Sequence, residues 1–343
     1  MIVEAIAKLV EGQSLSQEEA AAAMEDIMEE RATPAQFGAF VAALRLKGET
    51  VDEIAGMAQV MRRKALRVPT DLPVVDTCGT GGDGSGSFNV STAAAFVVAA
   101  AGRPVAKHGN RGMSSRCGSA DVLEALGANI LLGPDAVARC IEQAGIGFMF
   151  APAFHPAMKF AAPLRREIGI RTVFNVLGPL TNPAGARMQV LGVASAAAQE
   201  RLAGALERLG ATRALVVHGA DGLDEISVSA STHIYDVRPG QVTQYQVHPE
   251  QLGLRSGPAA AIRGGDAAEN AEIIRSVLAG RAQDPITETR RDFVALNAAA
   301  ALVACGAAAD LASGVQLASD VIRSGEALAR LDAFVRTTRA LAA

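Results

Sequence analysis

The first 70 residues carry apolar positions at helical spacing, and three stretches begin with a start signal. They are "SQEEAAAAMEDIMEE", "TPAQFGAFVAALRLKG" and "TVDEIAGMAQVMRRKAL". Ser16 and Thr50 each open a capping box, and Thr33 is a cap followed by Pro34. The preceding "MIVEAIAKLVEGQSLS" has the pattern of an amphipathic helix. We therefore expect residues 1–70 to form a small all-helical domain.

From Leu72 onward, short apolar runs alternate with helices rich in Ala and Leu. The runs are "PVVDT", "RPVAKHG", "GIGFMFAP", "MQVLGVAS" and "RALVVHGA". This alternation predicts an α/β fold with a mostly parallel central sheet flanked by helices. Residues 71–343 should form this large domain, with a hairpin in "THIYDVRPGQVTQYQVHPEQLGL" and only helices from Ala267 onward.

Residues 160–185 interrupt this alternation. The segment "FAAPLRREIGIRTVFNVLGPLTNPAG" is rich in Pro, Gly and Arg, and it has the pattern of neither a clear strand nor a clean helix. We expect it to leave the sheet and return to the helical domain, which would be completed by about residues 163–185.

Composition excludes several classes of partner. The formal net charge is -4 and no block of one sign occurs, so neither nucleic acid nor an anionic membrane is expected as a partner. The four cysteines are scattered without metal-ligating spacing, as free thiols of a reducing cytosol would be. No apolar stretch reaches the roughly 20 residues that a membrane span needs. A soluble, cytoplasmic protein is expected.

A glycine-rich loop, "GTGGDGSGSFNVST" at 79–92, follows the first predicted strand. Ligands of parallel sheets collect at such strand ends, and exposed N–H groups at a helix start favour phosphate. The loop is no Walker A motif, because no lysine occurs between 74 and 92. Gly79, Gly81 and Gly84 match the dinucleotide fingerprint, but basic "RPVAKHGNR" stands where its acidic ribose ligand should be. A merely flexible loop is the remaining alternative.

Asp83 lies inside this loop, where it would repel a phosphate unless a divalent cation came with it. Magnesium prefers oxygen ligands and commonly bridges carboxylates to substrate phosphates. Asp224 and Glu225 stand side by side after the strand 214–218 and could supply the other carboxylates. Neighbours on a regular strand point to opposite faces, so a shared site needs loop geometry or two metal ions. Taken alone, the pair could also be a surface feature.

The segment "AKHGNRGMSSRCGS" at 106–119 follows the next strand. Lys107 and Arg111 can neutralise a phosphate, Asn110 offers a neutral donor and acceptor, and nearby serines can close around it. We find no nucleophile elbow and no cysteine placed in a triad, so no dedicated acid, base or covalent nucleophile is expected. Together these features predict a site for a polyphosphorylated sugar bound through magnesium.

Four motifs then carry a resemblance. In this order and spacing, "GTGGDGSGSFNVST" (79–92), "KHGNR" (107–111), "NVLGPLTNP" (175–183) and "DGLDE" (221–225) resemble the anthranilate phosphoribosyltransferase family. These pentosyltransferases join anthranilate to phosphoribosyl pyrophosphate (PRPP) in tryptophan synthesis. The resemblance implies a nucleoside phosphorylase-type α/β domain, a homodimer formed through the helical domain, and Mg²⁺, with two ions per active site.

The resemblance also implies roles for individual residues. The PRPP-binding set would be Gly79, Gly82, Asp83, Ser87, Asn89, Val90, Ser91, Thr92, Lys107, His108, Gly109, Asn110, Arg111, Gly112, Met113, Ser114, Ser115 and Ser119. Anthranilate would contact Gly79, Asn110, His155, Arg165 and Gly178, in a channel lined also by His108 and Pro179, and the metal set would be Ser91, Asp224 and Glu225. Two positions depart from the family pattern: Ser87 stands where threonine is common, and Met158 leaves the channel's detailed shape open.

The residue chemistry agrees with this transfer. Arg165 could hold the anthranilate carboxylate through a bidentate fork, although an exposed helical face for Arg165-Arg166 is the alternative. The aniline nitrogen is neutral at pH 7 and needs no strong base, so we expect a dissociative displacement with inversion. Two rival functions remain: a pyrimidine nucleoside phosphorylase, and a transferase-like protein that binds nucleic acid. The net charge of -4 disfavours the second.

Overall fold

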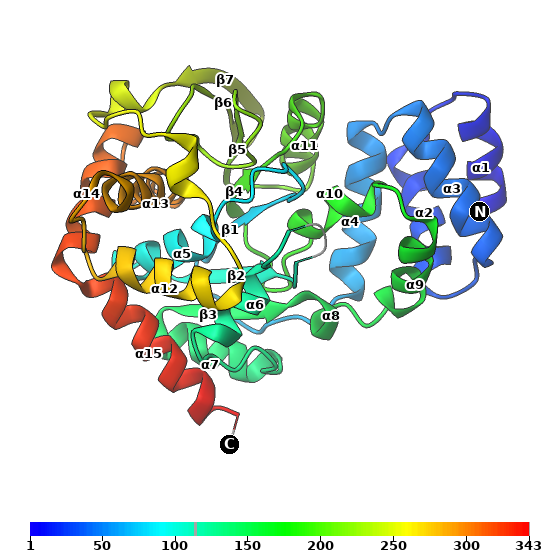
Figure 1. Cartoon of the computed structure of the whole chain (residues 1–343). Helices are drawn as coiled ribbons and strands as arrows, with labels where there is room; N and C mark the ends of the chain where they lie inside the picture. The colour runs from blue at the N-terminus through cyan, green and yellow to red at the C-terminus, as the bar shows by residue number, and fades with distance from the viewer. Residues whose placement is uncertain (113–114, 343) are drawn as a thin grey trace.

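The N-terminal part of the chain is a helical unit. The computed structural model describes residues 1–112 and 115–342 (Figure 1). Its first helices are α1 (Ile2–Val10), α2 (Gln17–Met28), α3 (Pro34–Lys47) and α4 (Val51–Lys64). The side chains of Ser16, Thr33 and Thr50 accept the N–H of the third residue of their helices, so the predicted caps are confirmed.

A seven-stranded sheet forms the centre of the rest of the chain, with the order β3-β2-β1-β4-β5-β6-β7. The first five strands are parallel: β1 (Val75–Gly79), β2 (Val105–Gly109), β3 (Ile146–Phe150), β4 (Met188–Gly192) and β5 (Arg213–Gly219). The hairpin of β6 (Thr232–Arg238) and β7 (Gln241–Val247) is antiparallel. The predicted α/β class, the mostly parallel sheet and the hairpin are confirmed.

Helices cover both faces of this sheet (Figure 1). One core lies between the sheet and α5, α7, α12, α13, α14 and α15, and a second joins the opposite face and α11 to the N-terminal helices. The two cores form because alternate strand residues face opposite sides: Leu215 and Val217 of β5 enter the first, and Ala214 and Val216 the second.

The covering helices have the following bounds. They are α5 (Val90–Ala100), α6 (Ser119–Ala125), α7 (Pro134–Ala144), α11 (Ala196–Arg208), α12 (Ala267–Leu278), α13 (Pro285–Ala304), α14 (Leu311–Ser324) and α15 (Glu326–Ala340). Two short 3-10 segments, η2 (Pro249–Leu252) and η3 (Ala259–Ile262), connect the hairpin to α12. The helical C-terminal region that was expected from Ala267 is confirmed.

The segment between β3 and β4 is more helical than its sequence suggested. It contains α8 (Ala151–Phe154), α9 (Met158–Ile168), α10 (Phe174–Leu177) and the 3-10 turn η1 (Gly178–Leu180). The expectation of no clean helix was wrong for α9, which is a regular helix despite Pro163 because its apolar face packs on α2 and α3. The ring centres of Phe174 and Phe37 lie 5.6 Å apart, so this segment does return to the N-terminal helices.

Two further observations concern the whole chain. All four cysteines are free thiols. Within residues 1–112 and 115–342, no helix is long and apolar enough to cross a membrane.

Candidate active site

Asp224 lies over the carboxyl ends of two neighbouring strands. Gly79 and Gly192 pair at the ends of β1 and β4. A Cβ on Gly79 would stand 2.5 Å from Asp224 Oδ2, and a Cβ on Gly192 would collide with the Asp224 carbonyl. The absence of side chains at both strand ends therefore makes room for Asp224, for its carboxylate at Gly79 and for its main chain at Gly192. Asp224 comes from the loop after β5.

The glycine loop after β1 folds toward the same carboxylate. Gly81 donates its N–H to Asp224 Oδ2 over 2.7 Å. Asp83 Oδ1 accepts the N–H of Ser85 over 3.1 Å, whereas Asp83 Oδ2 is buried without a partner among the described residues. In the described part of the chain, the N–H groups of Gly82, Gly84 and Gly86 also have no intramolecular partner. The loop thus presents bare N–H groups beside an unsatisfied carboxylate oxygen.

The carboxylates crowd one another in a buried place. Burial, followed by the charge of Asp83, raises the pKa of Asp224 to about 6. Burial and the neighbouring Asp224 raise the pKa of Glu225 well above its ordinary value, and Lys107 partly offsets this. Buried carboxylates that repel one another are stabilised by a cation, and an all-oxygen donor set suits magnesium.

The chain alone does not supply a full coordination shell. No group of three His, Cys, Asp or Glu side chains among residues 1–112 and 115–342 has metal-holding geometry. Magnesium usually takes one or two carboxylates and completes its shell with water and substrate phosphates. The unpartnered Asp83 Oδ2 and the crowded Asp224 and Glu225 therefore fit a magnesium ion that arrives with a phosphorylated ligand.

Asn297 binds the main chain of the acidic loop, which is the segment after β5 that carries Asp224 and Glu225. Sequence reasoning missed this role. The Oδ1 atom of Asn297 accepts the N–H of Ile226 over 2.9 Å, and its Nδ2 donates to the Ile226 carbonyl over 3.1 Å and to the Phe293 carbonyl over 2.9 Å. Asn297 is 2% exposed inside the apolar helix α13. A lone amide within "FVALNAAAALVA" was the available signal, because a buried amide needs partners.

Lys107 and the start of α5 are tied together behind the glycine loop. Lys107 is 2% exposed; its ammonium donates to the Thr77 carbonyl and lies 3.3 Å from Ser91 Oγ. Burial lowers the pKa of this lysine. Thr92 Oγ1, two residues after Val90 begins the helix, is buried without a partner among the described residues. Lys107 therefore stands behind Ser91 rather than at an open surface.

Asn89 directly precedes α5, but its side chain makes no capping bond. Its Nδ2 donates to the Cys117 carbonyl over 3.1 Å, and its Oδ1 accepts from Nδ2 of Asn270 over 2.9 Å. Nearby, Ser87 forms an isolated bridge to Arg263. The amide of Asn89 thus links the glycine loop to the loop before α6 and to α12.

The loop after β2 is stabilised by its own ion pairs. Arg111 pairs with Asp121 and Glu124, and its guanidinium lies 5.5 Å from the centre of the Phe150 ring. It was predicted to neutralise phosphate, but here its charge already has two carboxylate partners. Gly112 donates its N–H to Asp121 Oδ2 over 2.9 Å.

The remaining predicted residues of this loop lie close together. A Cβ on Gly109 would collide with Ser119 Oγ, which itself lies 3.4 Å from the Asn110 carbonyl. Ser115 Oγ donates to the Cys117 carbonyl over 3.3 Å. Met113 and Ser114, also predicted to bind PRPP, lie outside the described residues.

His108 and His155 form a buried pair whose ring centres are 5.0 Å apart. Burial lowers the pKa of His108 to about 3 and that of His155 to about 4, so both rings are neutral at pH 7. The main chain at Gly178 acts in the opposite direction on the pKa of His108, as that at Thr181 does on the pKa of His155, and both Nε2 atoms are buried without partners among the described residues. The structure thus brings the predicted acceptor residues His155 and Gly178 to His108.

Arg165 is the cationic member of the predicted acceptor set. It lies in the last turn of α9, where its guanidinium carbon is 5.3 Å from the centre of the Phe174 ring. Burial lowers its pKa, and no carboxylate among the described residues pairs with it. Met158 begins the same helix. A half-buried guanidinium without a carboxylate partner is available to an anionic ligand.

Asn182 anchors the end of this segment, which sequence reasoning also missed. Its Nδ2 donates to Asp76 Oδ2 over 2.7 Å and to the Ala106 carbonyl over 2.8 Å. Burial raises the pKa of Asp76 to about 6, with Lys107 acting in the opposite direction. The segment that carries Gly178 and Pro179 is thereby fixed to β1 and β2.

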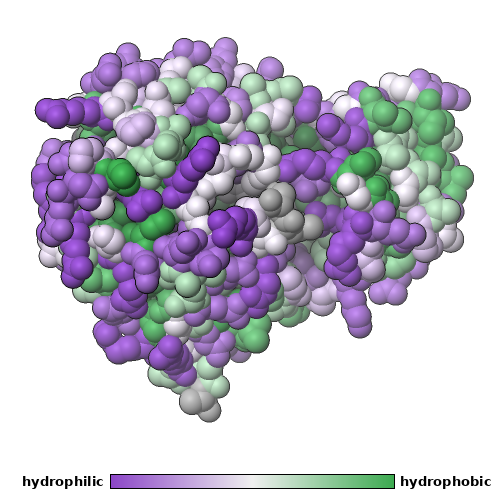
Figure 2. Space-filling model, in the orientation of Figure 1, coloured by the Kyte–Doolittle hydropathy of each residue, from purple (hydrophilic) through white to green (hydrophobic). Residues whose placement is uncertain are grey.

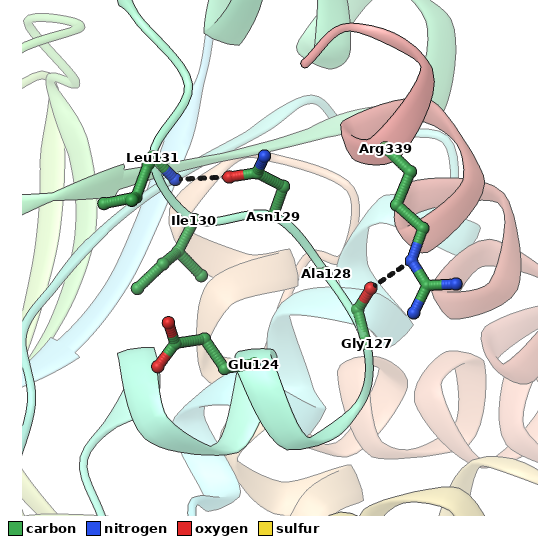
Figure 3. A pocket seen from close by; sticks show the side chains of 7 residues that line it. All are labelled: Glu124, Gly127, Ala128, Asn129, Ile130, Leu131 and Arg339. Atoms are coloured by element: carbon green, nitrogen blue, oxygen red, sulfur yellow. Dashed lines mark hydrogen bonds between the residues drawn. The ribbon is translucent and has the colours of Figure 1, made fainter. Parts of the chain in front are cut away.

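A surface pocket of about 300 Å³ lies beyond α6, where Arg339 of α15 donates to the Gly127 carbonyl over 2.7 Å (Figure 3). Its other lining residues are Glu124, Ala128, Asn129, Ile130 and Leu131. None of them belongs to the predicted site, and Glu124 already pairs with Arg111.

Comparisons with known proteins agree with this geometry. The helical bundle domain of the glycosyl transferase family matches residues 3–65, and its a/b domain matches residues 71–328. An anthranilate phosphoribosyltransferase of Chloroflexus aurantiacus is 60% identical over 98% of this chain and 99% of its own length.

Solved structures give the same result. The crystal structure of the Thermus thermophilus anthranilate phosphoribosyltransferase is 46% identical, with a TM-score of 0.90 over 98% of this chain and 99% of that one. The Saccharomyces cerevisiae enzyme, in complex with PRPP and Mg, is 28% identical, with a TM-score of 0.88 over 99% and 98%. The identity extends through both the helical and the α/β part, and the chain therefore belongs to the anthranilate phosphoribosyltransferase family.

Proposed function

We propose that the strand ends around Asp224 are where this chain transfers the phosphoribosyl group of PRPP to the amine of anthranilate. The products are N-(5-phosphoribosyl)anthranilate and pyrophosphate. The observation that carries the proposal is the glycine loop, whose N–H groups without partners among the described residues adjoin the crowded carboxylates of Asp83 and Asp224. An anion alone would be repelled there, whereas a magnesium diphosphate satisfies both groups.

The donor is held by the glycine loop, the start of α5 and the loop after β2. N–H groups of the glycine loop donate to phosphate oxygens, and Thr92 Oγ1 supplies a buried hydroxyl that lacks a partner among the described residues. Lys107 acts from behind Ser91 by setting its orientation and adding positive charge. Arg111 keeps its ion pairs and acts by shaping its loop.

Magnesium use is supported by the yeast relative, which was solved with PRPP and Mg. In this chain Ser91, Asp224 and Glu225 would hold the metal, with Asp83 close by, and two ions per site accommodate the side-by-side pair of acids. Magnesium held by these residues would stabilise the negative charge of the leaving pyrophosphate. Asn297 hydrogen-bonds the main chain of Ile226 and thereby fixes the positions of Asp224 and Glu225, which directly precede it.

Anthranilate would lie between the histidine pair, Gly178 and Arg165. Arg165 offers a fork for the carboxylate, and the flat ring suits an apolar channel. The neutral rings of His108 and His155 present Nε2 atoms without described partners, which can hydrogen-bond the acceptor without adding charge. Their low pKa values leave no positive charge that would hinder attack by the amine.

The displacement needs no covalent enzyme intermediate. The aniline nitrogen is already a nucleophile at pH 7, so the chain's contribution is to bind and orient the two substrates. We propose a dissociative, oxocarbenium-like displacement with inversion at the anomeric carbon. Isolation of a ribosylated side chain during turnover would contradict this mechanism.

We also propose the following organisation. Residues 1–70, completed by about 163–185, form the helical domain, and residues 71–343 form the PRPP-binding domain. A homodimer would use the helical domain, on whose surface Figure 2 shows hydrophobic residues. Among its large apolar side chains, Met1, Val3, Val10 and Leu46 are 64%, 59%, 68% and 88% exposed. Such a patch favours association with a second copy.

The transfer is tested by following anthranilate fluorescence with purified protein, PRPP and magnesium, with EDTA as the control. A magnesium-dependent decrease is expected. No decrease, with folded protein that still binds PRPP, would mean that the acceptor is another amine.

A further inference from the structure

We propose that Arg171 is a positioning residue, which fixes the glycine loop in its donor-binding shape. It would also join that loop to the acceptor segment, which is the stretch from α9 to η1 at residues 158–180. This inference rests on the proposed function. Arg171 stands between α9, which carries Arg165, and α10, which leads to Gly178. No motif considered in the sequence analysis assigns it a role.

Arg171 contacts the loop at two consecutive glycines. Its Nη2 donates to the Gly81 carbonyl over 3.0 Å, across 90 positions of sequence. A Cβ on Gly82 would collide with Nη1 of the same guanidinium. Glycine at 82 therefore does more than permit a positive φ of 74°, because it also leaves the space that Arg171 fills.

The contact holds Gly81 from both sides. The N–H of Gly81 is held by Asp224 of the acidic loop, and its carbonyl is held by Arg171 of the acceptor segment. Gly81 belongs to the loop that would bind the donor. It thus contacts both the acidic loop, which would bind the metal, and the acceptor segment.

The base of Arg171 is anchored although its side chain is exposed. The next residue, Thr172, donates its N–H to Asn175 Oδ1 over 2.9 Å and is 6% exposed, and Val173 is 1% exposed. No acidic side chain among the described residues forms an ion pair with Arg171. Its one described hydrogen bond is the bond to the loop, so its guanidinium is committed to that contact.

A restraint of this kind matters most for a glycine-rich loop. Gly81, Gly82, Gly84 and Gly86 have φ between 64° and 75°, and such residues lose much conformational entropy when they are ordered. A cross-segment hydrogen bond selects the binding-competent shape in advance and reduces that cost when the donor binds.

The first test compares Arg171→Ala with Arg166→Ala. Arg166 lies in the same segment, is exposed and makes no described contact with the loop, so its variant controls for the lost charge. In Arg171→Ala, the calorimetric Kd and the KM for PRPP should rise about tenfold or more, with little change in the KM for anthranilate. Arg171→Lys should recover part of the loss, because a single donor can still reach the carbonyl.

The second test is a double-mutant cycle with Gly82→Ala. The intrinsic cost of alanine at a positive φ is common to both backgrounds and cancels in the cycle. The methyl group displaces Arg171 only when arginine is present, so Gly82→Ala should weaken PRPP binding several-fold more in wild type than in Arg171→Ala. Additive effects would overturn the proposal, since a charge acting at a distance would not depend on residue 82.

The outcomes separate this inference from the proposed function. Normal wild-type turnover, with equal PRPP binding in Arg171→Ala and Arg166→Ala, would overturn only the role of Arg171. Absence of wild-type turnover would reject the transfer reaction, and the calorimetric PRPP titrations would still decide whether Arg171 positions the loop.

Discussion

Gly81 donates its N–H to Asp224 Oδ2 over 2.7 Å, which joins the glycine loop after β1 to the acidic loop after β5. The two residues are 143 positions apart and meet because β1 and β4 both end in glycine, which leaves room for the carboxylate and the main chain of Asp224. This contact explains why an aspartate, Asp83, is tolerated within a phosphate-type loop. The loop lies against carboxylates that need a cation, so we propose that the metal and the diphosphate bind there as one unit.

Replacement of Arg165 with alanine should weaken anthranilate binding specifically. The guanidinium lacks a carboxylate partner among the described residues, so loss of its charged hydrogen bonds should raise the KM for anthranilate on the order of tenfold to a hundredfold. Steady-state kinetics against each substrate in turn measures this. Arg166→Ala is the matched control, and an equal loss of affinity for PRPP would show that the assignment is wrong.

Asp224→Ala should reduce turnover and change its magnesium dependence. Removal of this carboxylate takes away a proposed metal ligand and the acceptor of the Gly81 N–H, so kcat should fall on the order of a hundredfold. The magnesium concentration at half-maximal rate should rise. Asp221→Ala is a control in the same loop, because Asp221 bonds Ser227 and has no proposed role at the metal. An unchanged rate and magnesium dependence in Asp224→Ala would make Asp224 a structural residue only.

Without metal, Asp224 should make the protein less stable as pH rises. Its pKa is about 6 in the folded protein and near 3.8 when unfolded, so the folded state binds more protons between these values. The free-energy cost of burying the ionised Asp224 carboxylate is therefore absent below about pH 3.8. It grows as pH rises through this window and is fully present above about pH 6.

Asp224→Asn removes this cost while an amide oxygen can still accept the Gly81 N–H. In EDTA at pH 7.5 the variant should be more stable by roughly 1–3 kcal/mol, and the difference should vanish near pH 4. His108, His155 and Asp76 also have shifted pKa values, but they are common to both proteins and cancel in the comparison. Glu225 does not cancel, because the Asp224 charge raises its pKa; loss of that charge stabilises the variant in the same direction at high pH. The measurement is denaturant unfolding of both proteins across this pH range. A difference in the free energy of unfolding that did not depend on pH would contradict the account.

Asn297→Leu should disturb the acidic loop from a distance. The substitution leaves the N–H and carbonyl of Ile226 without partners, which should lower the free energy of unfolding by roughly 1–3 kcal/mol. The magnesium requirement should also rise, because Glu225 directly precedes Ile226 in the chain. Gln199→Leu is a comparable change of a buried amide that donates to the Val216 and His233 carbonyls instead, so it should leave the magnesium requirement nearly normal. Equal effects in both variants would argue against a specific role for Asn297.

Local signals in the sequence predicted much of the fold. Caps at Ser16, Thr33 and Thr50 are short-range features, and each bond forms within one turn of helix. The strand–helix alternation was sufficient to predict a mostly parallel sheet. The helix α9 was missed because Pro163 weighs against it locally, whereas its stability comes from packing on α2 and α3.

The candidate site was predictable as a set of loops but not as a network of contacts. Asp83, Asp224 and Glu225 could be grouped from their places after strands, because parallel strands end at one edge. The supporting bonds of Asn182 and Asn297 join residues 106 and 71 positions apart, and no local pattern encodes them. Lys107 was expected to face a phosphate, but its burial behind Ser91 depends on the packing of α5 against β2.

The most direct measurement of the central claim is a calorimetric titration of PRPP into the protein with magnesium and with EDTA. Wild type and Arg165→Ala should both bind PRPP tightly only with magnesium, and Asp224→Asn/Glu225→Gln should lose at least tenfold in affinity under the same conditions. Binding that is equally tight in EDTA, or unchanged in the doubly substituted protein, would contradict a donor site in which carboxylates and phosphate are joined by magnesium.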